Sequence, residues 1–336
     1  MKLKTVGALF GAAAIAVSMS ACSTTSGAQT RDAAGDAAAK PTIYASTDVW
    51  ASVAKAVVGQ KAEVITSIDQ PNLDPHSYEA SVQDKKLVNQ ASVVIVNGGG
   101  YDDWALQLAK SADRKPTVLN AVELAGIDCG EEAHEHQHEH EHEHEGEEAH
   151  EHEHEGHHHH HHHCSVNEHV FYDLHAVGEV AKAVAKTMSQ TDGDNAAAYQ
   201  EGAKAFQDQL ETLEAQAETI KARGHKHSLA TEPLANYLLE DAGIHDLTPE
   251  EYVEQSETES GPSVKTQADT KALITEGKVD VLLVNSQTED PVSKSLQEAA
   301  EAKGIPVVTL SETLAGASDY VSWIGAALDQ LDKALQ

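Results

Sequence analysis

Two cysteines, Cys129 and Cys164, enclose a segment made almost entirely of histidine and glutamate. The segment holds 16 of the 22 histidines and 12 glutamates, and it ends in seven consecutive histidines. Neutral imidazole is a ligand for zinc, copper and nickel, and nearby carboxylates concentrate cations. Nothing in the segment can form a hydrophobic core, so it must be solvated. The composition therefore predicts a protein that handles a divalent transition metal. Acidic low-complexity filler and an internal tag are the alternatives.

We expect residues 130–163 to form a loop that binds metal weakly. A disulfide between Cys129 and Cys164 would close this loop and stabilise the fold by roughly 4 kcal/mol. Two free thiols adding soft metal ligands are the alternative. The expected auxiliary ligands are His134, His136, His138, His140, His142, His144, His150, His152, His154, His157, His158, His159, His160, His161, His162 and His163.

Four shorter motifs carry further donor side chains. They are Asp74–Glu79 with His76, Asn167–Asp173 with His169, Thr231–Pro233 with Glu232, and Ser311–Leu314 with Glu312. Pro75 fixes its own φ and restricts the residue before it, so His76 is expected on a rigid loop. Taken singly, a loop histidine is more often a surface residue, and a glutamate after a strand is more often a helix cap.

Alternating strand and helix patterns surround these motifs and predict two parallel-sheet α/β lobes, 41–190 and 224–336. Expected strands are 42–46, 62–68, 93–97, 117–119, 227–230, 279–285 and 306–310, and expected helices are 49–58, 82–90, 102–110, 234–241, 267–276, 291–303 and 319–335. One long helix over 194–223, with Asp194 as N-cap and Gly224 as stop, is expected to join the lobes rigidly. Three of the four motifs follow strands, where ligands bind in such sheets.

The first residues of the chain predict export. Lys2 and Lys4 precede a short apolar run, so residues 1–21 are typical of a signal peptide. The run ends in a box resembling a bacterial lipoprotein cleavage site, with Cys22 as the lipidated residue; an ordinary signal peptide is the alternative. Residues 22–40 then form a flexible tether. The expected location is extracytoplasmic and lipid-anchored to the cell membrane, where a disulfide is permitted.

The net charge and the length of the chain limit its possible partners and its number of domains. The formal net charge of −32 excludes nucleic acid as a partner. About 260 residues remain beyond the signal peptide, the tether and the histidine segment, enough for two ordinary domains.

The ordered motifs together resemble the solute-binding proteins of bacterial zinc and manganese ABC importers, the group whose lobes are joined by one long helix. The resemblance runs from about Thr42 to the C-terminus. It rests on Asp74–Glu79, Asn167–His169 and Thr231–Tyr237, and on the C-terminal runs Val284–Thr288 and Ile305–Leu314. The segment Asn97–Trp104 also resembles one lining the edge of the first lobe in that family.

This resemblance implies a metal site at the interface of the lobes, with His76, His169, Glu232 and Glu312 as ligands. Glu79, Asn285 and Gln287 are expected to orient the imidazoles by accepting from the non-ligating N–H. We interpret the other four histidines, His175, His225, His227 and His245, as structural or surface residues. Since imidazole must lose its proton to bind metal, affinity is expected to fall below about pH 6.

The implied function is capture of Zn²⁺ for a membrane permease with its ATPase, by a chain expected to be a monomer. The histidine loop favours zinc, because manganese binds imidazole weakly. Glu232 favours manganese, because zinc-type relatives often have histidine at its position. A manganese or iron importer component of the same family and a metal buffer or adhesin on this fold remain alternatives. An enzyme is not expected, since no His-Glu-x-x-His motif occurs outside the histidine segment and four ligands would fill the tetrahedral shell of a zinc ion.

Overall fold

The computed structural model describes residues 40–71, 73–127, 167–256 and 261–336. The predicted signal peptide, the lipidation site Cys22, the histidine loop and the pair Cys129 and Cys164 lie outside the described residues. No helix in the described ranges is long and apolar enough to cross a membrane.

The first lobe is built on a four-stranded parallel sheet with strand order β2-β1-β3-β4. Its strands are β1 (Thr42–Thr47), β2 (Glu63–Ile68), β3 (Val93–Val96) and β4 (Thr117–Asn120). The helices that follow them in sequence are α1 (Asp48–Val58), α2 (Val82–Gln90), α3 (Asp103–Ser111) and α4 (Ala121–Leu124). β1 and β3 are buried on both faces, as expected for central strands covered by helices on both sides.

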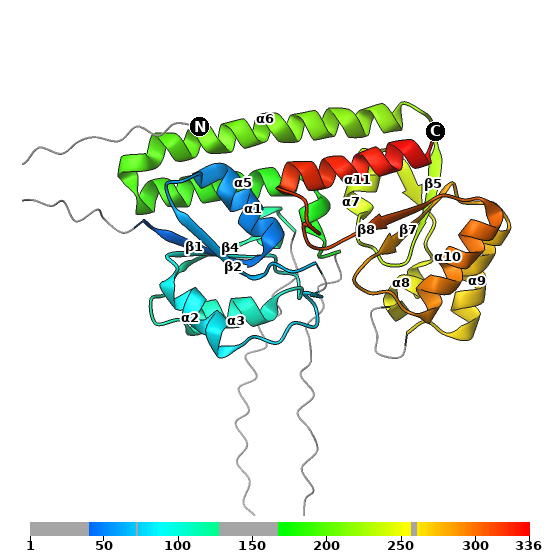
Figure 1. Cartoon of the computed structure of the whole chain (residues 1–336), viewed down its shortest axis with the longest axis horizontal. Coiled ribbons are helices and arrows are strands. Elements are labelled where there is room, and N and C mark those ends of the chain that lie inside the picture. Colours follow the sequence, from blue (N-terminus) through cyan, green and yellow to red (C-terminus); the bar gives the residue numbers. More distant parts are fainter. Residues whose placement is uncertain (1–39, 72, 128–166, 257–260) are drawn as a thin grey trace, which may run out of the picture. The chain divides into compact units, whose positions relative to one another are not determined.

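The second lobe repeats this architecture with strand order β6-β5-β7-β8, also parallel. Its strands are β5 (Lys226–Ala230), β6 (Ile244–Asp246), β7 (Val281–Asn285) and β8 (Val307–Leu310). Its helices are α7 (Asn236–Asp241), α8 (Glu250–Ser256), α9 (Val264–Thr275), α10 (Pro291–Lys303) and α11 (Tyr320–Ala334). The predicted α/β fold with two parallel-sheet lobes is therefore confirmed (Figure 1).

Between the two sheets in sequence lie η1 (Val170–Tyr172), α5 (Leu174–Thr191), η2 (Gly193–Asn195) and the 26-residue helix α6 (Ala196–Lys221). Figure 1 shows α6 running beside α11 and α5 and along both lobes. Its buried residues, such as Phe206 and Leu213, belong to one hydrophobic cluster that also contains β1, β3, β5, β7 and β8 residues. Because both sheets share this core, the helix fixes one lobe against the other.

The predicted start of the long helix was wrong. Asp194 does not cap α6; it lies in η2, and α6 begins at Ala196 after Asn195. Asp192 anchors this corner instead, accepting hydrogen bonds from Asn195 Nδ2 at 2.8 Å and from the Tyr199 hydroxyl at 2.6 Å. At the other end, Gly224 has a φ of +103°, consistent with its predicted role as a stop. The sequence analysis also missed β6, whose three residues are too short to show an alternating pattern.

We predict that Gly202→Ala destabilises the fold. Gly202 lies where α6 crosses α1, and a Cβ there would stand 2.1 Å from the carbonyl oxygen of Val57. Because the contact is with backbone atoms that cannot rotate away, we expect a cost of about 3 kcal/mol, the upper end of the usual range of about 1–3 kcal/mol, which exceeds the gain of about 1 kcal/mol in helix propensity. Thermal unfolding should show a Tm lower by about 2 °C or more. Gly193→Ala is the matched control, because its added Cβ meets no atom within 4 Å. Equal Tm values would contradict this close approach of α6 to α1.

Candidate metal centre

Four loops bring the candidate ligands together. His76 lies on the loop after β2, Glu232 follows β5 by two residues, and Glu312 follows β8 by two residues. His169 directly precedes η1. Because the carboxyl ends of parallel strands meet at one edge of a sheet, each sheet offers its loops to the same region.

Three of the four predicted ligands have converged. One donor atom each from His76, His169 and Glu312 lie within 4.8 Å of one another, and this is the only such group of metal-binding side chains found in the described part of the chain. Glu232 is outside this group. Its half-buried side chain contributes to the wall of a cavity of about 270 Å³, which is also lined by His76, His169 and Asp74.

His169 presents a lone pair to the site. Its side chain is buried, and its Nδ1 lies 2.7 Å from Oδ1 of Asn167. The same oxygen accepts the backbone N–H of His169 at 3.0 Å, which fixes the orientation of the amide. Nδ1 must therefore carry the hydrogen, and Nε2, which has no hydrogen-bond partner among the described residues, carries the lone pair. Burial lowers the pKa of His169 to about 4, which keeps the ring neutral.

His76 has the opposite protonation state. Its Nε2 lies 3.2 Å from Oε2 of Glu312 and its Nδ1 lies 3.6 Å from Oε1 of Glu168. Burial alone would lower the pKa of His76. The Glu312 carboxylate, and to a smaller extent Glu168 and Asp74, outweigh this effect and raise the pKa to about 9. The side chain is 36% exposed, so it is the most accessible of the three converging groups. At neutral pH a proton thus occupies the space between Nε2 and Oε2 that a cation would take.

Glu312 supplies the buried negative charge. Its side chain is 1% exposed, and burial by itself would raise its pKa. Contact with His76, the nearby His169 and a hydrogen bond from Asn285 outweigh this and lower the pKa to about 2. Oε2 makes no hydrogen bond of ordinary geometry with the described residues. His169 Nε2 is thus buried with no hydrogen-bond partner among the described residues, and Glu312 Oε2 is buried with the His76 imidazole beside it, a combination that favours a cation.

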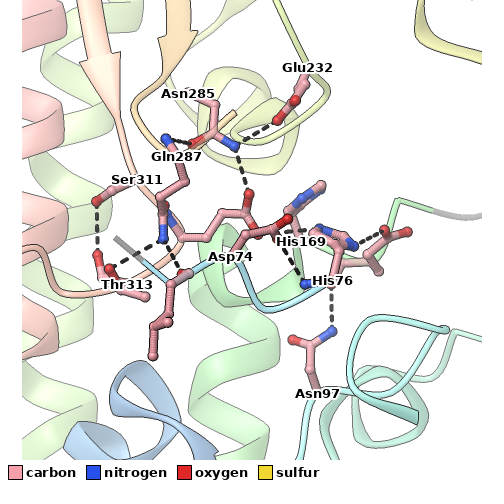
Figure 2. Close-up of polar contacts among 12 residues, drawn as sticks. Asp74, His76, Asn97, His169, Glu232, Asn285, Gln287, Ser311 and Thr313 are labelled. Atoms are coloured by element: carbon pink, nitrogen blue, oxygen red, sulfur yellow. Dashed lines mark hydrogen bonds and ion pairs between the residues drawn. The ribbon is translucent and has the colours of Figure 1, made fainter. Parts of the chain in front are cut away.

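The amide of Asn285, the last residue of β7, joins the two acidic candidates. Its Nδ2 donates to Oε2 of Glu232 and to Oε1 of Glu312, each at 2.6 Å (Figure 2). Burial raises the pKa of Glu232, partly offset by hydrogen bonds that include the one from Asn285. The amide therefore holds two like-charged groups near one another, which is otherwise costly.

The predicted roles of the surrounding residues need correction. Asn285 and Gln287 do not orient the imidazoles: Asn285 donates to carboxylates, and Gln287 Oε1 accepts the backbone N–H of Glu312 at 2.6 Å. Glu79 is exposed, and none of the hydrogen bonds or ion pairs found for the described residues involves it. Asn167 and Glu168 contact the imidazoles instead. The sequence analysis missed both residues. They directly precede His169, and the expectation that each imidazole N–H needs an acceptor is the signal that could have identified them.

Contacts between the lobes fix the loops that carry the site. The Tyr172 hydroxyl donates to the carbonyl oxygen of Ser311 at 2.9 Å, one residue before Glu312. The Leu314 N–H donates to the Asp48 carboxylate at 3.1 and 3.2 Å, two residues after it. Gln287 Nε2 donates to the carbonyl oxygen of Leu73 at 3.0 Å (Figure 2). The backbone on both sides of Glu312 is thus held in place, independently of any bound ion.

Comparison with known proteins identifies relatives. The family of the periplasmic zinc-uptake complex component A matches residues 43–334. The metal ABC transporter substrate-binding lipoprotein SloC of Streptococcus mutans is 35% identical over 80 residues, which are 23% of this chain and 26% of that protein. The chain thus matches about a quarter of the length of this curated relative.

Solved structures share the fold. The SBP FpvC of Pseudomonas aeruginosa, in complex with Mn²⁺, has a TM-score of 0.66 at 21% identity, covering 88% of this chain and 98% of that one. The periplasmic zinc-binding protein TroA of Treponema pallidum has a TM-score of 0.66 at 16% identity, covering 88% and 99%. At these identities the likeness shows a common fold.

Proposed function

The chain belongs to the family of the periplasmic zinc-uptake complex component A, and from that premise we propose that it captures Zn²⁺ outside the cytoplasmic membrane for an ABC importer. The observation that carries the proposal is the convergence of His76, His169 and Glu312 on one point. His169 Nε2 is buried without a hydrogen-bond partner among the described residues, and Glu312 Oε2 is buried 3.2 Å from His76 Nε2. The family is one of binding components, so we do not assign an enzyme activity.

Glu232 is the proposed fourth ligand. It faces the same cavity as both histidines, and its carboxylate shares the Asn285 amide with Glu312. A cation between the two carboxylates would relieve their repulsion, so a modest rotation of the half-buried Glu232 side chain brings it into the ligand set. Two imidazoles and two carboxylates carry a formal charge of −2, which neutralises a divalent cation.

Zinc is the proposed cargo because the segment 130–163 is rich in imidazole, which manganese binds weakly. Monodentate carboxylates would give the four-coordinate shell that zinc prefers. Manganese is the second candidate: bidentate carboxylates would raise the coordination number to five or six. The fold neighbour FpvC was solved with Mn²⁺, and TroA is described as a zinc-binding protein. Both metals are therefore compatible with this fold.

The proposed function also includes attachment to the membrane and binding to a permease. We propose that Cys22 carries a lipid anchor, that the chain acts as a monomer, and that a permease docks on it and receives the ion while an ATPase supplies energy. SloC, the curated relative, is described as a lipoprotein of a metal ABC transporter.

Anomalous diffraction from protein purified without added metal tests the cargo. Data collected on both sides of the zinc and manganese absorption edges should give a peak at the zinc edge only, between His76, His169 and Glu312. A peak at the manganese edge only would replace zinc with manganese. No peak there in crystals soaked with either metal would overturn the proposed site.

Deleting residues 131–163 should remove many weak metal sites and leave one tight site. The deleted residues contain the 16 clustered histidines and none of the four proposed primary ligands. Isothermal titration with zinc should therefore lose most of its weak phases and keep the high-affinity phase unchanged. Disappearance of the tight phase would mean that the primary ligands are in the loop.

A further inference from the structure

Three potential metal ligands lie side by side at the opposite end of the second sheet. His227 of β5 is the register partner of His245 of β6, so the two side chains lie on the same face of neighbouring parallel strands. On the other side of His227, Asp280 directly precedes β7, and its N–H donates to the His227 carbonyl oxygen at 2.8 Å. We propose that His227, His245 and Asp280 form a second binding site for a divalent transition metal, separate from the primary centre.

The spacing of the two imidazoles suits a shared ion. Their ring centroids are 6.0 Å apart, compared with 5.6 Å for His76 and His169 in the primary centre. Two rings that bind one zinc ion through nitrogens about 2.0–2.1 Å from the metal have centroids at a similar separation. The rings are inclined by 70°, so they are not stacked on each other.

The carboxylate is already fixed beside one of the rings. Oδ2 of Asp280 lies 3.8 Å from Nδ1 of His227 and accepts the backbone N–H of His227 at 2.8 Å. The donors are not yet as close as in the primary centre, so metal binding requires a side-chain rotation by His245. This residue is exposed, so it can rotate without disturbing the core.

Because its ligands are exposed, the second site is expected to bind metal more weakly than the primary centre and to select among metals differently. His227 and Asp280 are 42% and 39% exposed, so water competes for the ion. Two nitrogens and one oxygen leave a coordination position for water. With imidazole as the main donor, the site should take zinc, copper or nickel and discriminate against manganese.

This site is distant from the primary centre. His227 lies near the start of β5 and Glu232 follows the end of the strand, five residues later, so roughly 16 Å separate them at about 3.3 Å per residue. Occupation of one site therefore does not require occupation of the other.

Histidine hydrogen–deuterium exchange, measured by mass spectrometry on the full chain, resolves individual imidazoles. After one equivalent of zinc has filled the tight site, excess zinc should slow exchange at His227 and His245 together. In His245→Gln, the protection of His227 by zinc should be lost. In Asp280→Asn, the zinc concentration needed for half-protection should rise by at least about tenfold.

His225→Gln is the matched control, since His225 is exposed and only two residues from His227 but is not one of the three proposed ligands. It should leave the protection unchanged, and so should His76→Ala, which removes a partly exposed ligand of the primary centre. No protection of His227 in saturating zinc, or protection that survives His245→Gln, would overturn the second site. The His76→Ala result also separates the two proposals, because protection at His227 does not depend on the primary ligands.

Discussion

Replacing His169 with alanine is expected to weaken zinc binding at the primary centre by more than about 100-fold. The replacement removes the buried Nε2 that carries a lone pair into the site. Even the loss of a group that only orients a ligand typically costs about 10- to 100-fold in affinity, so the loss of a ligand costs more. The measurement is zinc retained against a competing chelator strong enough to strip the weak sites of the histidine loop.

His76→Ala should give a comparable loss, and it separates binding from folding. His76 is partly exposed, so its truncation leaves no cavity in the core, whereas truncation of the buried His169 can also destabilise the fold. The matched control is His175→Ala, which removes an exposed histidine of α5 six residues after His169. If both ligand variants retain zinc as the control does, the primary centre is elsewhere.

The sequence predicted best those elements whose ends carry local signals. The predicted bounds of α2 and α10 match the structure because a capping box starts each helix, with Ser81 and Asp84 at α2 and Asp290 and Ser293 at α10. The start of α6 was misplaced because Asp192 anchors the corner through Tyr199, which lies in the first turn of the helix. Such a contact depends on how the chain folds back and leaves no local pattern.

For the candidate site, residue types were easier to predict than hydrogen-bond partners. Histidine and glutamate on loops after strands pointed to metal ligands, and three of them converge. The bridge from Asn285 to Glu232 and Glu312 joins residues 53 and 27 positions apart. The oxygen atoms that the Asn285 amide reaches depend on the relative positions of the ends of β5, β7 and β8. They also depend on the rotamers of the side chains. The types of ligand can therefore be predicted from the sequence, whereas the hydrogen-bond partners of these side chains depend on the tertiary structure.

The shared core restricts how the ion can enter and leave. A single hydrophobic cluster includes residues of both sheets, α6 and α11, so a wide hinge motion would expose buried apolar surface. The loop that carries His76 is held to the second lobe by polar contacts such as the Gln287–Leu73 hydrogen bond, and its residues His76 and Ser77 are exposed, so its movement would expose little apolar surface. We therefore expect metal exchange to proceed through this loop, with His169 and Glu312 as the fixed part of the centre.

Zinc affinity is expected to fall about tenfold for each unit by which pH is lowered from 8 to 6. The pKa of His76 in the metal-free protein is raised to about 9, so below that pH its ring holds a proton that zinc must displace. Each bound ion then releases one proton, and the affinity decreases in proportion to proton concentration. An unperturbed histidine, with a pKa near 6.5, would give constant affinity above about pH 7. The dependence thus extends to higher pH than expected from the sequence.

Competition titrations at pH 6, 7 and 8, together with proton release measured in weak buffer, test this linkage. Glu168→Gln is the informative variant, because Glu168 contributes to the raised pKa of His76 and lies 3.6 Å from its Nδ1. Removing that charge should lower the pKa, so fewer protons are released near pH 8 while zinc still binds. Lowering the pH below about 4 protonates His169 as well, which should make the loss of zinc steeper. Affinity that stays constant between pH 7 and 8 would show that His76 is neutral before the metal arrives, and that Glu312 Oε2 faces no imidazolium in the free protein.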